Sequence, residues 1–175
     1  MRYPSRLVFR LSLCLTPALA GCAQAPTISS AEVDNVLTMA ALSAVQKLSG
    51  YCVKSVLEKN WMEIGDARKP GGWIDSPDGK SFHYRWVSSP QRNKLPDAAL
   101  MAFPNAKIKR ECHHTLVFHK PDFVQIRSES ETYLSALITF EDRCPICGSG
   151  YSVRFRKDKG EWVIESPGIT QTSLI

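Results

Sequence analysis

The sequence predicts an α+β fold in which N-terminal helices pack on a curved, mainly antiparallel sheet. Between residues 30 and 48, apolar side chains recur at helical spacing. After residue 65 they alternate with polar side chains, as in strands that have one wet face. Residues 30–175 are enough for one compact core, so we expect a single domain there.

The clearest predicted helix lies in "SSAEVDNVLTMAALSAVQKLSG", which begins at Ser29. One face of this helix carries the apolar residues Val33, Val36, Leu37, Ala40, Ala41, Ala44, Val45 and Leu48. Ser29 and Glu32 have capping-box spacing, and Gly50 supplies a stop signal. We expect "YCVKSVLEKNWMEIG", residues 51–65, to form a second helix or a bent extension, because Val53, Val56, Leu57 and Trp61 repeat the helical spacing.

A β-hairpin is predicted next. "GWID" and "KSFHYRW" flank the turn residues 76–79, which read "SPDG". On its second strand, alternation places Phe82, Tyr84 and Trp86 on one face. The hairpin therefore has an aromatic face.

A short helix and an antiparallel meander complete the predicted domain. The helix is "DAALMAF", residues 97–103. The strands are 114–119, 123–129, 132–141, 151–157 and 161–165, and "KPD" joins the first two. We expect the last residues, "GITQTSLI", to fray, although they are apolar enough to dock onto a partner.

This order of elements resembles the cone-shaped fold named after nuclear transport factor two, also called cystatin-like. The resemblance implies a curved sheet that wraps around helices. Functions on such a fold range from ligand pockets to enzymes and assembly modules, so the function must be argued from particular residues.

The N-terminus has the pattern of a secretory signal. Arg2, Arg6 and Arg10 precede the apolar run "LSLCLTPALAG", which is too short, and broken by Pro17, to span a bilayer as a helix. The run ends in small residues, as peptidase sites do. We therefore expect residues 1–21 to be a signal peptide.

The next residues, "LAGC", resemble the lipobox of bacterial lipoproteins. This resemblance implies that the Cys22 thiol receives a diacylglycerol and that Cys22 becomes the N-terminus. Residues 22–29 then form a lipidated tether. In lipoproteins of Gram-negative bacteria, Asp after the cysteine signals inner-membrane retention, so Ala23 implies the outer membrane, facing the periplasm.

Net charge gives no case for nucleic-acid binding. The chain has 22 basic and 17 acidic residues, and three of the basic residues lie in the segment 1–21. The mature chain then has 19 basic against 17 acidic residues, a formal charge of +2. A strongly basic surface, as nucleic acid requires, is not expected.

Four cysteines follow Cys22 in a compartment that favours disulfides: Cys52, Cys112, Cys144 and Cys147. Three pairings are open. We prefer Cys144 with Cys147 and Cys52 with Cys112, because the first joins near neighbours and the second fastens the helical half to the sheet. The longer loop closes about 60 residues.

"CPICG" allows two other interpretations. It resembles the knuckle of zinc ribbons and rubredoxins, and a zinc site could use Cys144, Cys147, Cys112 and His114, with His113 or Cys52 as further candidates. Otherwise we expect no cofactor. A thiol oxidoreductase usually places its attacking cysteine at a helix N-terminus, whereas "GSGYSVRF" after the second cysteine indicates a strand.

The histidines do not form an obvious site. His113 and His114 are adjacent and point to opposite faces of a strand, and His113 and His119 are about 20 Å apart on a regular strand. Nor does the sequence contain G-x-S-x-G, H-E-x-x-H or a phosphate-binding glycine loop.

The function we predict is therefore a non-catalytic binding or assembly subunit of an envelope complex, held on the membrane at Cys22, with an envelope protein as partner. One alternative is a pocket that binds a small ligand or performs catalysis, lined by Trp61, Tyr84, Trp86 and Trp162. The other is a metal or redox module at "CPICG".

Overall fold

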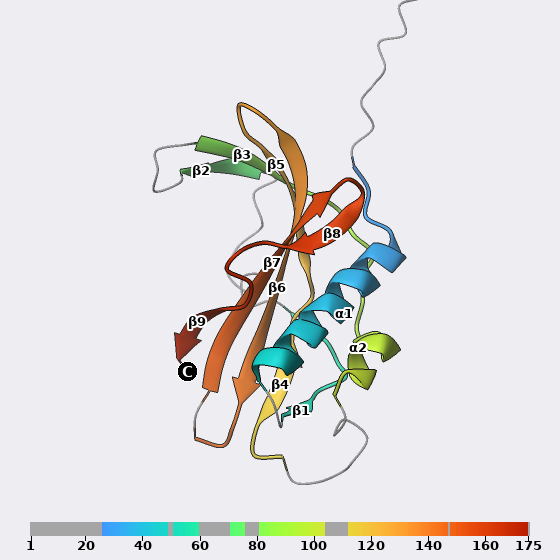
Figure 1. Ribbon diagram of the computed structural model, residues 1–175, viewed down its shortest axis with the longest axis vertical. Coiled ribbons are helices and arrows are strands. Elements are labelled where there is room, and N and C mark those ends of the chain that lie inside the picture. The colour runs from blue at the N-terminus through green and yellow to red at the C-terminus, as the bar shows by residue number, and fades with distance from the viewer. Residues whose placement is uncertain are drawn as a thin grey trace, which may run out of the picture.

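The computed structural model describes residues 26–48, 51–59, 71–75, 81–103, 112–146 and 148–174. In this part of the chain, two helices and one nine-stranded sheet form a mixed α+β fold (Figure 1). The helices are α1 (Ser30–Lys47) and α2 (Asp97–Met101). The strands are β1 (Cys52–Val53), β2 (Gly71–Asp75), β3 (Ser81–Trp86), β4 (Thr115–Phe118), β5 (Asp122–Arg127), β6 (Thr132–Arg143), β7 (Gly148–Asp158), β8 (Glu161–Ile164) and β9 (Thr170–Leu174).

Helix α1 begins at the predicted capping box. The Glu32 amide donates to the Ser29 hydroxyl oxygen at 3.3 Å, and the Ser29 amide donates to the Glu32 carboxylate at 2.9 Å. Lys157 of β7 donates to the same carboxylate at 2.5 Å, which holds the first turn of the helix beside this strand. Six residues of the predicted apolar face are buried: Val33, Val36, Leu37, Ala40, Ala41 and Ala44.

The predicted second helix is wrong for its described residues. Cys52–Val53 is strand β1, and Val56 and Glu58 form isolated bridges in an extended segment. The Lys54 amide donates to the Leu116 carbonyl at 2.9 Å, so the segment follows the edge of β4. β-branched residues fit an extended backbone well, and pairing with a neighbouring strand overrides the helical spacing. Residues 60–65 lie outside the described chain.

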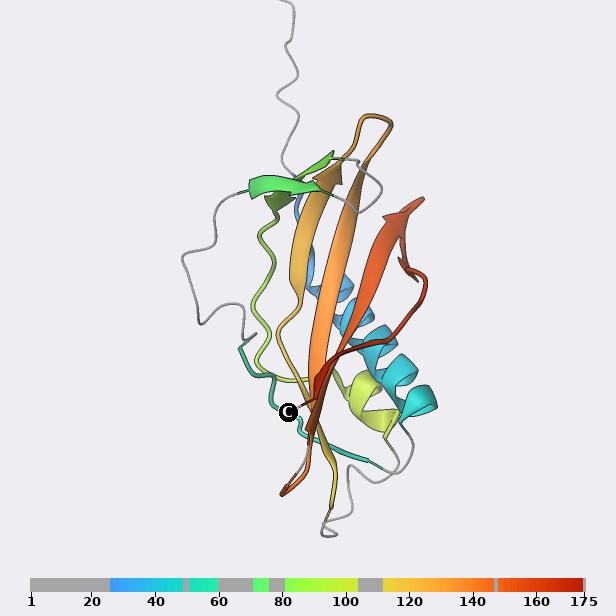
Figure 2. The ribbon, with the colours of Figure 1, turned by 90° about the vertical axis from the view of Figure 1, so that its left-hand side faces the viewer.

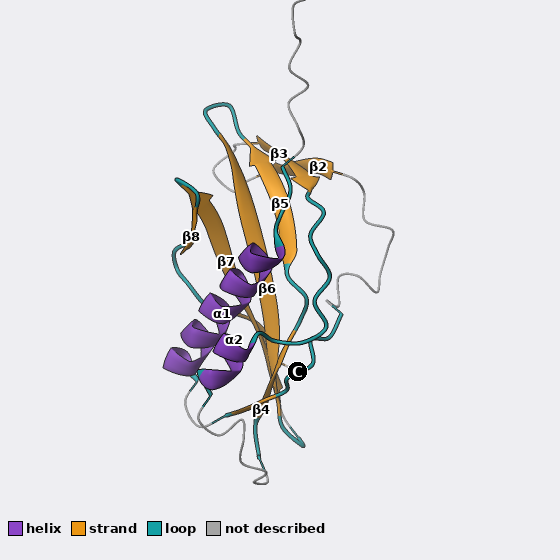
Figure 3. Cartoon of the chain, turned by 90° about the vertical axis from the view of Figure 1, so that its right-hand side faces the viewer, coloured by secondary structure: helices purple, strands orange, loops and turns teal. Residues whose placement is uncertain are grey.

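The predicted hairpin and the short helix are confirmed. β2 and β3 pair antiparallel with Trp73 opposite His83, and the predicted turn 76–79 lies outside the described residues. Along β3, half-buried and exposed side chains alternate. α2 falls within the predicted range, and both helices lie on the same side of the sheet (Figure 3).

β4 and β5 lie end to end along one edge of β6, whereas the sequence predicts separate strands of a meander. Phe118 lies opposite Phe140 and Asp122 lies opposite Leu137, so the register shifts by one residue between the two strands. Pro121 falls in the interruption and has no N–H to donate, which explains the break in the ladder. The chain continues in the same direction beyond it.

β7 covers the other edge of β6 and carries both C-terminal strands. The two-residue turn from β7 to β8 uses Lys159 and Gly160, with φ of 47° and 92°, as a type I′ hairpin requires. The predicted fraying of the C-terminus is wrong, since β9 pairs antiparallel with β7 and Thr170 lies opposite Ser152. Unsatisfied backbone groups at the edge of β7 explain why this segment is ordered.

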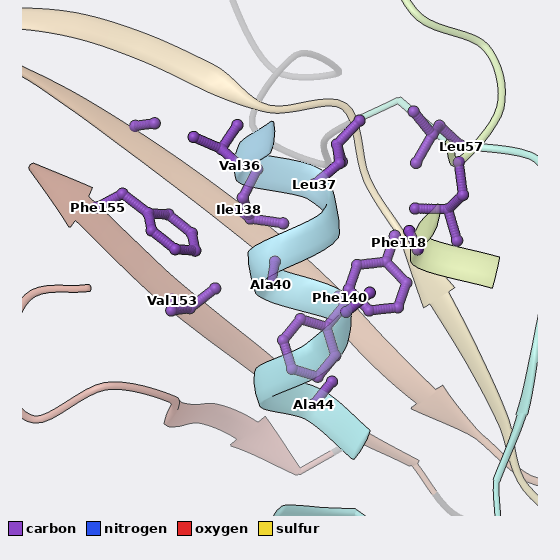
Figure 4. Packing of buried hydrophobic residues seen from close by; sticks show 14 of the residues in the cluster. Val36, Leu37, Ala40, Ala44, Leu57, Phe118, Ile138, Phe140, Val153 and Phe155 are labelled. Carbon is purple, nitrogen blue, oxygen red and sulfur yellow. The ribbon is translucent and has the colours of Figure 1, made fainter. Parts of the chain in front are cut away.

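One buried cluster includes the apolar face of α1 and one face of the sheet (Figure 4). At its centre, the Phe140 ring stacks between Phe118 and Tyr151, with centroid separations of 4.9 and 5.3 Å. The 18 residues of α1 extend about 27 Å, roughly two thirds of the length of about 40 Å that the 12 residues of β6 span. No helix in the described residues is long and apolar enough to span a bilayer.

The long strands give the domain two distinct ends (Figure 2). One end, called the tether end after the predicted tether that precedes α1, holds the start of α1, Lys157 and the β5–β6 loop, residues 128–131. In this region Arg156 binds Glu131 through two hydrogen bonds of 3.0 and 2.6 Å. At the distal end lie the β6–β7 turn, residues 144–146, and the residues that precede β4.

Candidate interaction site

The distal end holds the Cys52–Cys112 disulfide. The two Cα atoms are 6.0 Å apart, and the cysteines are 60 residues apart in the sequence. Cys52 lies opposite Thr115 in the parallel pairing of β1 with β4, and its amide donates to the His114 carbonyl at 3.1 Å. The disulfide therefore fastens the segment after α1 to the edge of the sheet.

Cys144 lies in the same region, directly after β6. Arg143 pairs with Thr115, so the ladder brings Cys144 to the level of His114. Cys144 is disulfide-bonded. Cys147 lies outside the described residues, and its pairing with Cys144 stays a prediction.

The alternative zinc site does not have its ligands free in this structure. The sulfurs of Cys112 and Cys144 are in disulfides. Within the described ranges, no group of three or more His, Cys, Asp or Glu residues has the geometry to hold a metal ion. A cysteine binds zinc only as a free thiolate, so these disulfides and a zinc ion bound by the same cysteines exclude each other.

His114 is bound to a buried carboxylate at the distal end. Its Nδ1 lies 3.0 Å from both carboxylate oxygens of Asp142. The Asp142 side chain is 8% exposed, whereas the His114 side chain is 42% exposed. Because a carboxylate only accepts, Nδ1 carries the proton and Nε2 is the nitrogen available to a ligand.

Tyr51 fixes the other side of the His114 ring. The two rings meet edge to face with a centroid separation of 5.1 Å. Burial, followed by the charge of Asp142, raises the pKa of Tyr51. The phenol thus stays neutral, and its ring packs against an imidazole whose Nε2 can take part in a hydrogen bond.

The opposite face of the sheet carries a second polar group, centred on His119. This side chain is 2% exposed, with Nδ1 at 2.9 Å from the Thr139 hydroxyl and Nε2 at 3.3 Å from the Glu141 carboxylate. Burial lowers the pKa of His119, although Glu141 works in the opposite sense. His119 therefore belongs to the internal structure of the sheet and does not join His114.

Arg143 links this group to the segment beside β4. It donates to Glu141 at 2.7 Å and to both oxygens of Glu58 at 3.1 and 2.9 Å. Lys54 donates to Glu58 at 2.7 Å. Hydrogen bonds from Arg143 and Lys54 lower the pKa of Glu58 to about 2. These bonds join the segment that follows β1 to the distal end of β6.

The turn between β6 and β7 presents an isoleucine that the sequence analysis missed. Ile146 is 98% exposed, the highest value among the exposed large apolar residues of the described chain. The cysteines are the conspicuous residues of "CPICG". An isoleucine between two cysteines in a turn, however, cannot reach the core and is therefore exposed. The position of Ile146 between two cysteines of a turn was therefore the sequence signal that could have identified it as exposed.

The described hollows are not lined by the aromatic residues of the predicted pocket, Tyr84, Trp86 and Trp162. Trp162 is buried against Phe123, with ring centroids 5.7 Å apart, and Tyr84 packs on Trp86 at 6.2 Å. A hollow of about 820 Å³ lies at the tether end. Its described lining consists of Ser81, His83 and residues 127–132 and includes none of these aromatic residues. Trp61 lies outside the described chain.

Comparison with protein-family models, curated proteins and solved structures finds no match to this chain. The interpretation of the distal end therefore depends on its geometry. The structure brings together Cys52, Cys112, His114 and Cys144 at that end, and it separates His119 from them.

We predict that replacing both Cys52 and Cys112 with alanine lowers the free energy of unfolding by about 2–4 kcal/mol, because the unfolded chain loses a constraint on a long loop. Urea unfolding of the purified domain measures this loss. A reductant should destabilise the wild type at least as much, because it also opens the disulfide of Cys144. Equal stability of the double variant and the oxidised wild type would contradict the structural role of this disulfide.

We also predict that the domain loses stability as the pH falls below about 6.5. In this pH range His119 of the unfolded chain takes up a proton. In the folded protein the buried side chain stays neutral, because burial lowers its pKa. The slope reaches at most about 1.4 kcal/mol per pH unit. Urea unfolding between pH 7.5 and 5.5 measures it.

The matched variants for this experiment are His119→Gln and the exposed His113→Gln. The slope should diminish in His119→Gln and persist in His113→Gln. Glu58 affects stability in a separate pH range. Its contribution to the free energy of unfolding is complete above pH 4.5 and is lost as the pH falls toward 2. An unchanged slope in His119→Gln would refute the assignment.

Proposed function

We propose that this protein is a lipoprotein of the bacterial outer membrane, anchored through lipid at Cys22 and facing the periplasm. Its proposed role is that of a non-catalytic binding or assembly subunit of an envelope complex. The observation that carries this proposal is the "LAGC" motif, placed directly before a domain that begins only a few residues later. The preceding basic and apolar segment supports secretion.

The start of the fold supports a short tether. Ile28 is 4% exposed and belongs to the buried cluster, and α1 begins two residues later. Six residue steps separate Cys22 from Ile28, so the tether reaches about 20 Å when extended. Two or three acyl chains hold such a domain on the membrane, since each buried methylene contributes about 0.8 kcal/mol.

The distal end supports a binding role. Tyr51, His114 and Ile146 present an aromatic ring, an oriented imidazole and an exposed apolar side chain in one region. Disulfides at Cys52 and Cys144 constrain the same region. A rigid surface loses little entropy on association, and aromatic and apolar anchors dominate the energetics of protein interfaces.

We predict that Cys22→Ser abolishes membrane attachment, because no acyl chain can be added without the thiol. Fractionation of cells should recover the wild type in membranes, where detergent but not high salt releases it. Ala23→Asp provides the matched control, which should stay acylated but move to the inner membrane. Detergent-dependent membrane attachment of Cys22→Ser would show that the anchor lies elsewhere.

A further inference from the structure

The disulfide of Cys144 is a feature of "CPICG" that the proposed binding role does not use. Cys52 and Cys112 are bonded to each other, so neither is the partner of Cys144. The sequence predicts Cys147 as that partner, and Cys147 lies outside the described residues. Cys144 is half-buried, and residues 145–146 directly after it are exposed. The disulfide therefore lies beside a part of the turn that water reaches.

The stability of the fold does not account for this disulfide. β6 and β7 pair without interruption from Ser135 to Arg143 on β6, so the ladder already closes the turn. The entropic contribution of a disulfide increases with the length of the loop that it closes. Cys52–Cys112 spans a sequence separation of 60, whereas the predicted pairing with Cys147 closes a loop of only about four residues. The chemistry of this second disulfide then gives a better reason for its presence.

The register of the sheet places His114 beside Cys144. Thr115 lies opposite Arg143 in the last pair between β4 and β6. One residue further along both chains, His114 comes opposite Cys144, and opposite residues of antiparallel strands share a face. The Cβ atoms of such a pair are about 4.5–5.5 Å apart, which brings the imidazole within reach of the sulfur.

Asp142 holds this imidazole in one orientation. Nδ1 of His114 lies 3.0 Å from both carboxylate oxygens, and the Asp142 side chain is only 8% exposed. Nε2 is then the nitrogen that can take up and return a proton, and the carboxylate stabilises the imidazolium that forms. His114 is 42% exposed, so a group from outside can reach it. An oriented imidazole beside a sulfur is the arrangement that activates thiols.

We propose that the disulfide of Cys144 exchanges with a free thiol on the envelope protein that this subunit binds, and that His114 transfers the proton. The inference rests on the proposed binding role and adds one property of the partner, which is a cysteine thiol at the contact. The exchange is stoichiometric. It joins the two proteins covalently and does not turn over a substrate.

The step balances without a further reagent. The partner thiol gives its proton to Nε2 of His114, and its sulfur attacks the second sulfur of the disulfide. A new S–S bond forms between the partner and the second cysteine while the bond to Cys144 breaks. The sulfur of Cys144 leaves with the electron pair and takes the proton from Nε2. The partner thiol is thereby oxidised, and Cys144 is reduced to a thiol.

The first test uses the full chain, purified from membranes in detergent, with reduced glutathione as the probe thiol. Acid quenching, alkylation and peptide mapping by mass spectrometry follow the exchange at each disulfide. We expect the disulfide of Cys144 to exchange at least about tenfold faster than Cys52–Cys112 in the same molecules. Cys144 should appear as the free thiol, with glutathione on the second cysteine, which the map identifies.

His114→Gln and the exposed His113→Gln are the matched variants. At about pH 6.5, His114→Gln should slow the exchange by about tenfold or more, because general acid–base catalysis is lost. The deficit should be smaller at about pH 9, where the probe thiol is already ionised. A purely structural role of His114 would give the same deficit at both pH values. His113→Gln should stay within about twofold of the wild type, and thermal unfolding shows that both variants fold.

The second test identifies the partner in the native envelope. N-ethylmaleimide, added to intact cells, blocks the freed Cys144 thiol and so preserves the mixed disulfide with the partner. We expect one envelope protein joined to the chain until a reductant is added. A variant with both Cys144 and Cys147 replaced by alanine should lose this adduct, whereas a lysine-reactive cross-linker should still join it to the same protein.

Equal exchange rates at the two disulfides would overturn the inference, as would an unchanged rate in His114→Gln or a deficit that does not vary with pH. The absence of a mixed disulfide in the envelope would overturn it as well. If the lysine-reactive cross-linker still recovers a partner in that case, the proposed binding role stands without the exchange. If neither method recovers a partner, the binding role itself is refuted.

Discussion

The burial of one face of β6 is the constraint on which the rest of the structure depends. Ile138 and Phe140 are fully buried in the cluster that includes the apolar face of α1. β4 and β5 pair with one edge of this strand and β7 pairs with the other. Since successive side chains alternate, the same strand places Glu141 and Arg143 on the opposite face, where they bind His119 and Glu58. A change of register by one residue would exchange these two faces.

This arrangement also separates the two ends of the domain. The start of α1 is fixed beside Lys157, so the proposed tether would leave the domain at that end. Asp142 continues the buried face of β6 beyond the core, and there it binds His114. The Cys52–Cys112 disulfide keeps the neighbouring segment in place. A small domain built in this way could be attached to a membrane at one end and bind a partner at the other.

Patterns that depend on nearby residues were predictable from the sequence, whereas pairing between distant segments was not. The capping box at Ser29 and the alternation in β3 follow from residues a few positions apart. The segment around Cys52 has helical spacing, but the edge of β4 and Cys112 hold it extended. The partner of His114 could not be deduced either, because Asp142 lies 28 residues away and meets it through strand register. Ile146 was visible in the sequence, yet only the folded hairpin shows that it is exposed.

The proposed anchor is tested most directly by measuring how each end of the domain lies relative to a membrane. The lipidated protein is reconstituted in vesicles that contain acceptor lipids, with a fluorescent dye at position 129 in one sample and at position 146 in another. If the proposed tether holds the domain by the end that contains the start of α1, energy transfer to the membrane is stronger from position 129 than from position 146. Equal or stronger transfer from position 146 would contradict it.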